Sequence, residues 1–138
     1  MDHNDTLMID DKLTYENDLA TAVIGAAIEV HKVLGPGLLE SAYESALMYE
    51  LTLREYGFSS QVHLPLVYKG QDIGPVYRLD ILVERRLIVE LKSVEVLHPV
   101  HYAQTLNYLR ISKLKLALLI NFNTRYLKDG VHRLINTW

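Results

Sequence analysis

Two acidic residues and a lysine lie in one strand-like stretch of sequence, YRLDILVERRLIVELKSV at residues 77–94. Asp80 falls within one predicted strand, whereas Glu90 and Lys92 lie two residues apart on the next and so project from the same face. The residues between and around them are apolar and point to the opposite face. Because charged groups on the covered face of a sheet are unfavourable unless they bind a cation or a partner, the sequence predicts a site for one or the other here.

The register of the two strands decides whether Asp80 shares the face of Glu90. A two-residue turn at Glu84-Arg85 would pair residue 80 with residue 89 and place Asp80 on the opposite face. A three-residue loop, Glu84 to Arg86, pairs residue 80 with residue 90 and brings the two carboxylates together. The hypothesis that Asp80 and Glu90 form one site therefore predicts the three-residue loop, or a bulge with the same effect.

The elements that must position these side chains follow from the hydrophobic spacing. From Asn17, apolar residues recur every three or four positions until Gly35-Pro36-Gly37 ends the helix, and a second helix continues to Gly57. The elements predicted after Gly57 are strands at 60–69, 74–83 and 86–93, a helix from Pro99 to about Ser112, a buried strand at 114–122 and a turn with a short element at 125–138. This order predicts an α/β fold with a mixed sheet flanked by helices.

Composition limits the function classes. The chain of 138 residues is 49% hydrophobic and contains no cysteine, which excludes thiol nucleophiles, zinc–thiolate sites and iron–sulfur clusters. We expect residues 17–138 to form a single domain and the acidic residues 1–16 to form a mobile tail. The apolar segments are too short to span a membrane and the N-terminus is unlike a signal peptide, so we expect a cytoplasmic protein with no membrane partner.

The formal net charge of −3 is unevenly distributed. Residues 1–77 hold four Lys/Arg and twelve Asp/Glu, and residues 78–138 hold ten and five, so the charge changes from −8 to +5. Such asymmetry suggests a surface that faces a polyanion, although on charge alone ordinary solvated faces explain it better. The question for the structure is whether one groove beside the carboxylates is lined by the basic residues Arg78, Arg85, Arg86, Arg110, Lys113 and Lys115.

The strand motif resembles that of the PD-(D/E)XK nuclease superfamily, which places an Asp on one strand and Glu-x-Lys on the next. Asp80 matches the first part and Glu90-Leu91-Lys92 matches the second. Leu79 stands where the superfamily's name has proline, which is a backbone position and not a metal ligand. The resemblance runs from about residue 17 to residue 122.

Two helical motifs extend the resemblance. Gly37, Glu40 and Tyr43 have the spacing that names the GxxExxY family, a branch of that superfamily. Gln104 and Tyr108 are similar to the glutamine-x-x-x-tyrosine helix of RecB-type nucleases. Together the motifs imply a restriction-endonuclease-like αβββαβ core and a nuclease that acts on nucleic acid, with DNA as the expected substrate.

The chemistry of phosphodiester hydrolysis agrees with this resemblance. Mg²⁺ or Mn²⁺ prefers carboxylate and carbonyl oxygens, so Asp80, Glu90 and the backbone carbonyl of Leu91 are the expected ligands. Lys92 would orient or help to deprotonate the attacking water and offset the charge on phosphate. Glu40 would complete the ion's shell directly or through water. We expect these four charged side chains to be the catalytic residues.

Other positions keep two explanations. Gln104 and Tyr108 share a helix face and would hold the site or touch the substrate backbone, but a core position explains Tyr108 equally well. For Tyr43 the core explanation is the better one. His31, at the end of the first helix, is a weak candidate for a metal or packing role, because a capping or satisfied core histidine is more common.

The whole constellation also has an ordinary explanation, since an Asp, a Glu and a Lys on neighbouring strands more often form a cross-strand salt bridge. The joint occurrence of all the motifs in one order favours the nuclease. The alternative is a non-catalytic module that retains the nuclease fold to bind nucleic acid or protein. The sequence does not decide whether the substrate is DNA or RNA, or whether it is single or double stranded. It also leaves open whether cutting is internal or from ends, and whether the protein forms a homodimer.

Overall fold

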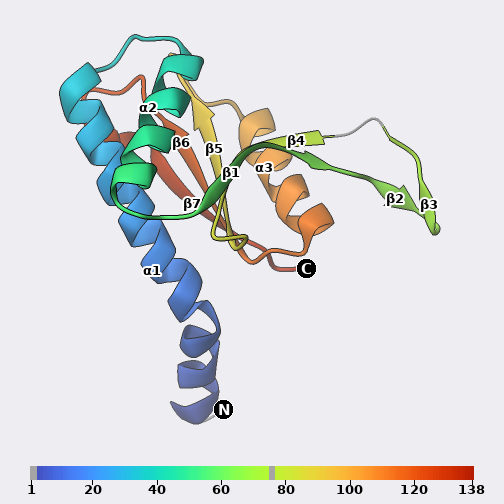
Figure 1. Ribbon diagram of the computed structural model, residues 1–138. Coiled ribbons are helices and arrows are strands. Elements are labelled where there is room, and N and C mark those ends of the chain that lie inside the picture. The colour runs from blue at the N-terminus through green and yellow to red at the C-terminus, as the bar shows by residue number, and fades with distance from the viewer. Residues whose placement is uncertain (1–2, 75–76) are drawn as a thin grey trace.

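Three α-helices flank a five-stranded sheet in the computed structural model, which describes residues 3–74 and 77–138 and, for residues 3–12, the backbone only. The helices are α1 (His3–Leu34), α2 (Glu40–Leu53) and α3 (Pro99–Ser112). The strand order is β1-β4-β5-β6-β7, formed by Phe58–Leu64, Tyr77–Val83, Leu87–Lys92, Leu116–Asn121 and Val131–Ile135. Helices α1 and α2 cover one face and α3 covers the other (Figure 1). The predicted mixed α/β fold is therefore confirmed.

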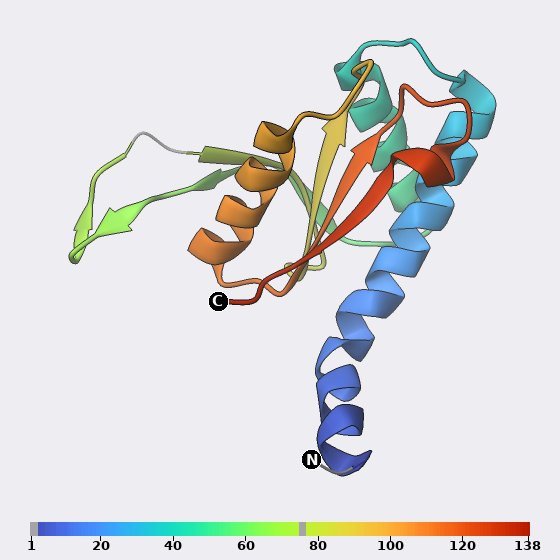
Figure 2. The same cartoon turned by 180° about the vertical axis from the view of Figure 1, so that it is seen from behind.

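The sheet is mixed because only one of its neighbouring pairs is parallel. Strands β5 and β6 run in the same direction, joined by α3, whereas the other three pairs are antiparallel. Parallel strands need such a crossover, and a helix usually provides it. Figure 2 shows α3 lying along the face of β5 and β6 opposite α1.

Two apolar layers hold these elements together. Leu47 and Leu51 of α2 and the small and branched residues of α1 pack on Val89 and Leu91 of the sheet. On the other face Ile88 packs under α3. Along β5, Leu87 and Val89 belong to the first layer and Ile88, between them, belongs to the second, as a side-chain period of two predicts.

The hairpin between β4 and β5 has the predicted three-residue loop. Val83 pairs with Leu87, so that Glu84 to Arg86 form the connection, and the pairs continue in this register to Ile81 and Val89. Both Glu84 and Arg85 adopt positive φ, at 51° and 57°, and the loop closes with a bond from the Arg86 N–H to the Val83 carbonyl at 2.9 Å.

Several boundaries differ from the predictions. Helix α1 begins at His3, not at Asn17, so the structure has helix where the tail was expected. Glu16 is buried, with Arg86 3.9 Å away, so the packed part of α1 starts before residue 17. The division into a tail and a domain stays a prediction. None of the described helices is both long enough and apolar enough to cross a membrane.

The predicted strand at 60–69 is interrupted, and β4, which lies within the predicted strand at 74–83, is described from Tyr77. Strand β1 ends at Leu64, and a separate pair, β2 (Val67–Tyr68) and β3 (Gln71–Asp72), forms an arm that extends past α3 (Figure 1). Residues 75–76 lie outside the described residues. The C-terminal element is a 3₁₀ helix, Leu127–Gly130, followed by the edge strand β7.

Gly130 offers a test of the packing at the end of β6. A Cβ added there would lie 2.0 Å from the Asn121 carbonyl oxygen, and a backbone atom cannot move aside cheaply. We expect Gly130→Ala to destabilise the protein by about 1–3 kcal/mol or more, measured by urea unfolding. Gly57→Ala is the matched control, because its Cβ would meet only the Glu84 side chain at 3.5 Å. Equal stability of the two variants would contradict this packing.

Candidate active site

The two carboxylates meet where β4 separates from β5. The register of the hairpin places Asp80 opposite Glu90, one position beyond the last ladder pair. Here side chains replace the backbone ladder: the Asp80 N–H donates to Glu90 Oε1 at 3.0 Å, and the Leu91 N–H donates to Asp80 Oδ2 at 2.8 Å. The predicted meeting of Asp80 and Glu90 is therefore found, and each carboxylate fixes the backbone of the other strand.

Burial and mutual repulsion dominate the electrostatics of this pair. Glu90 is 6% exposed. Burial, followed by the negative charge of Asp80, raises the pKa of Glu90 from 4.5 to about 9, and the charge of Lys92 opposes this only weakly. Without added positive charge, the Glu90 carboxyl is therefore protonated at neutral pH.

Glu40 approaches this pair from the other side of the sheet's end. It is the first residue of α2 and is half-buried. Burial raises the pKa of Glu40; the Lys92 charge lowers it, and the charges of Asp80 and Glu44 raise it further. Lys92 and the Asp80 carboxylate are thus close enough to Glu40 for their charges to act on it. The structure brings Glu40, Asp80, Glu90 and Lys92 together from three elements, α2, β4 and β5.

The remaining motif residues of this region shape the loop before α2. Gly37 has φ of 94°, a conformation that favours glycine over every other residue. Tyr43 is fully buried, as the core explanation expects, and its ring stacks on Phe122 with centroids 4.5 Å apart. Its hydroxyl is also bonded within the loop: it donates to the Gly35 carbonyl at 2.5 Å and accepts from the Leu38 N–H at 3.1 Å.

Helix α3 brings a tyrosine over the carboxylate pair. Tyr108 is 5% exposed, and burial, followed by the charges of Glu90, Asp80 and Tyr77, raises its pKa to about 12. Tyr108 is therefore both a core residue and a neighbour of the site. Gln104, one turn earlier, is exposed, and no hydrogen bond to the carboxylates is found among the described residues.

His101, which the sequence analysis did not single out, also lies near the candidate site. Partial burial, and after it the positive charges of Lys92 and His98, lower the pKa of His101, which places its ring beside the candidate site. Positions 101, 104 and 108 fall on one stripe of a helix. That spacing was the available signal, since it groups His101 with Gln104 and Tyr108.

His31 has a structural role. Its Nε2 lies 2.8 Å from the Thr124 carbonyl oxygen, and its ring contacts Phe122 with centroids 6.5 Å apart. These partners belong to the turn after β6. The structure therefore supports the satisfied core histidine and not the metal or substrate role.

The six basic residues do not line one groove beside the carboxylates. Leu87 pairs with Leu116 at the start of the parallel pair, so the preceding residues Arg86 and Lys115 lie at the opposite end of β5 from Glu90. The Arg86 guanidinium stacks over Tyr15 at 5.1 Å. Strand position, which the charge count ignores, separates these cations from the site.

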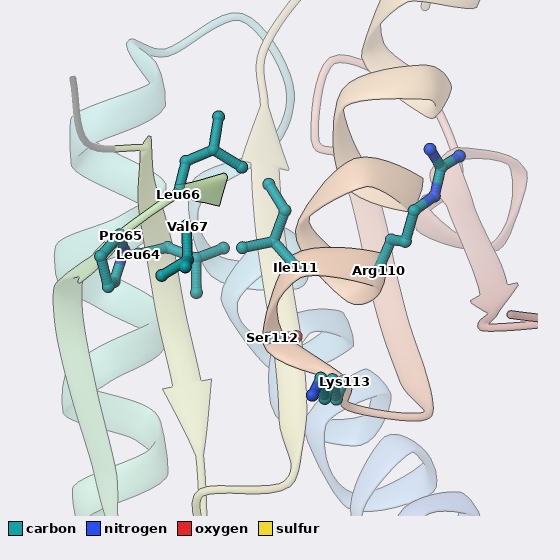
Figure 3. Close-up of a pocket in the computed structure, with 8 residues that line it drawn as sticks. All are labelled: Leu64, Pro65, Leu66, Val67, Arg110, Ile111, Ser112 and Lys113. Carbon is teal, nitrogen blue, oxygen red and sulfur yellow. The ribbon is translucent and has the colours of Figure 1, made fainter. Parts of the chain in front are cut away.

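A groove of about 750 Å³ lies between the β1–β2 connection and the C-terminal end of α3. Figure 3 shows Leu66 and Val67 facing Ile111 across it, whereas Arg110 extends from the far side of the helix, where its guanidinium stacks 3.9 Å over Trp138. The groove contains none of the carboxylates, so the candidate site is a separate feature.

The donor set at the carboxylate pair fits a hard divalent cation. Among the described residues, backbone N–H groups engage one oxygen of Asp80 and one of Glu90. The two side chains are also hydrogen-bonded to each other, and an ion would take the place of the proton between them. In an extended strand the N–H and C=O of one residue point to the same side, so the Leu91 carbonyl points toward β4, as its N–H does. No group of three His, Cys, Asp or Glu side chains able to hold an ion occurs within the described parts of the chain.

The mixed sheet thus carries an Asp on one strand and Glu-x-Lys on the next. Residues 17–134 match the family model of the PD-(D/E)XK nuclease superfamily. The chain belongs to this superfamily. No curated protein and no solved structure matches the chain significantly.

The Glu90 carboxyl makes stability depend on pH when no divalent cation is present. Its folded pKa of about 9 lies above the ordinary 4.5, so its contribution is full below pH 4.5 and is lost as the pH rises through 9. In EDTA, we expect the free energy of unfolding to fall with rising pH by up to about 1.4 kcal/mol per unit, relative to Glu90→Gln. Urea unfolding at pH 5 and pH 8 measures this difference.

Glu95→Gln is the control for this comparison, because Glu95 is exposed and its variant should keep the wild-type dependence. The interpretation fails if wild type and Glu90→Gln lose stability in parallel between the two pH values.

Proposed function

We propose that this protein is a divalent-metal-dependent nuclease that hydrolyses phosphodiester bonds of DNA, and that it belongs to the GxxExxY branch of its superfamily. The observation that carries the proposal is the in-register carboxylate pair, Asp80 and Glu90, with Lys92 on the same strand face. The Gly37, Glu40 and Tyr43 motif at the start of α2 supports the branch assignment.

The ion would be held by Asp80, Glu90 and the Leu91 carbonyl. When bound, Mg²⁺ or Mn²⁺ neutralises phosphate charge and lowers the pKa of an attacking water. Glu90 must lose its proton to act as a ligand. Ion binding would therefore release a proton when the pH lies between the ordinary pKa of 4.5 and the raised pKa of about 9. Glu40 would complete the ion's shell directly or through water.

Lys92 provides the positive charge of the site itself. Its charge acts on Glu40, Glu90 and His101, so it lies among the groups that would surround the scissile phosphate. There it would orient the attacking water and offset the charge that develops on phosphate.

Tyr108 and its stripe on α3 would support the substrate. With a pKa of about 12, the Tyr108 hydroxyl stays protonated and can donate a hydrogen bond to a carboxylate or a phosphate oxygen. Gln104 and His101 lie along the same stripe, and the exposed Gln104 side chain is free to reach the substrate backbone.

The second candidate is a binding module that keeps the fold without catalysis. What favours it is the raised pKa of Glu90, because burial and the Asp80 charge oppose the ionised form that a metal ligand needs. The two candidates differ in whether an ion binds and whether DNA is cut.

Cleavage is the direct test. Incubated with plasmid or single-stranded DNA and Mg²⁺ or Mn²⁺, the wild type should release cleaved product, and Asp80→Ala and Lys92→Ala should each lower the rate about 100-fold or more. Glu95→Gln, which alters an exposed carboxylate outside the proposed ligand set, should cleave like the wild type. Activity that survives both Asp80→Ala and Lys92→Ala would refute the assignment.

Ion binding separates the two candidates independently of turnover. Isothermal calorimetry with Mn²⁺ should show binding to the wild type and to Glu95→Gln, and loss of binding in Asp80→Asn, because one of two carboxylate ligands is then missing. The heat should depend on the ionisation enthalpy of the buffer, since Glu90 releases a proton. A wild type that binds no Mn²⁺ even with DNA present would favour the non-catalytic module.

A further inference from the structure

The loop between α1 and α2 is tied to the strand that carries the candidate site. Ser93, the residue after Lys92, donates its hydroxyl to the Leu38 carbonyl at 2.6 Å. Glu40 follows Leu38 by two residues. The position of Glu40 relative to β5 therefore depends on how firmly this loop is held.

The Tyr43 side chain holds the same loop from within. Its hydroxyl bridges the Gly35 carbonyl and the Leu38 N–H, at 2.5 and 3.1 Å. It thus joins both ends of the turn that precedes Glu40, while Gly37 between them has the positive φ that the turn requires.

The Tyr43 ring provides a second tie to the same strand end. It stacks on Phe122 with an interplanar angle of 8°, and the Phe122 N–H donates to the Lys92 carbonyl at 2.9 Å. The contacts form a closed path from Lys92 through Phe122, Tyr43 and the loop to Ser93. Glu40 lies on α2 immediately after this path.

We propose that Tyr43 is a positioning residue, whose hydroxyl fixes the α1–α2 loop and thereby holds Glu40 against the Asp80, Glu90 and Lys92 cluster. This inference rests on the proposed nuclease function for its catalytic consequence. It gives the tyrosine of the motif a role through Glu40 and not through the substrate, since the hydroxyl is already engaged by the loop backbone.

A double-mutant cycle tests this coupling. Tyr43→Phe removes the hydroxyl and keeps the ring, and we expect it to lower kcat about 10- to 100-fold with KM nearly unchanged. Glu40→Gln should have a similar effect, and adding Tyr43→Phe to Glu40→Gln should lower kcat little further, because both act on one group. Additive effects of the two substitutions would overturn the proposal.

One further variant is a control, and another tests the second tie to the loop. Tyr49→Phe alters a tyrosine of the same helix that is 66% exposed and should leave kcat and the melting temperature unchanged. Ser93→Ala removes the other tie to Leu38 and should reproduce the kcat effect of Tyr43→Phe. If Tyr43→Phe lowers the melting temperature but leaves kcat at the wild-type value, the residue is structural only and the proposal is wrong.

Amide hydrogen exchange tests the anchoring without any activity. The Ala42 N–H donates to the Leu39 carbonyl at the start of α2, and in Tyr43→Phe we expect it to exchange about tenfold faster, with the Leu51 amide unchanged. A wild type that cuts no DNA would refute the proposed function but leave this measurement valid. Unchanged exchange at Ala42 would refute the positioning role, whatever the activity.

Discussion

The site depends on one costly contact, the buried approach of the Asp80 and Glu90 carboxylates. Two acids placed together in a low-dielectric environment repel each other, and the protein alone relieves this by keeping a proton on Glu90. The contact is still formed because each carboxylate accepts a backbone N–H at the place where the ladder between β4 and β5 stops. Backbone N–H groups that would otherwise bond to the neighbouring strand's backbone donate to the two carboxylates instead.

The other elements can be understood as supports for this contact. Helix α3 places Tyr108 near the pair, and the crossover that α3 provides makes β5 and β6 parallel. Helix α2 begins beside the end of β5, so its first residue brings a third acid near Lys92. An energetically unfavourable group of charges is thus surrounded by a well-packed core, as is common for functional sites.

The sequence predicted the features that depend on parity and on strong local signals. The loop length followed from counting the residues between Asp80 and Glu90, and α3 was predicted from Pro99 at its start to Ser112. The arm of β2 and β3 was not separated from its neighbours, because strands of two residues leave no period to measure. Whether the basic residues line one groove could not be answered from the sequence, since the charge count does not show at which end of a strand a residue lies. Cytoplasmic location stays a prediction, and homodimerisation stays open.

The loop from Glu84 to Arg86 restricts how this gene segment can change over time. Removal or insertion of a single codon there would change the pairing parity and turn one carboxylate away from the other, whereas a change of two codons would preserve their shared face. Length variation among descendants of this sequence that keep the chemistry should therefore occur in even steps at this loop. The positive φ of Glu84 and Arg85 adds a second constraint, because it favours glycine, asparagine and aspartate as replacements.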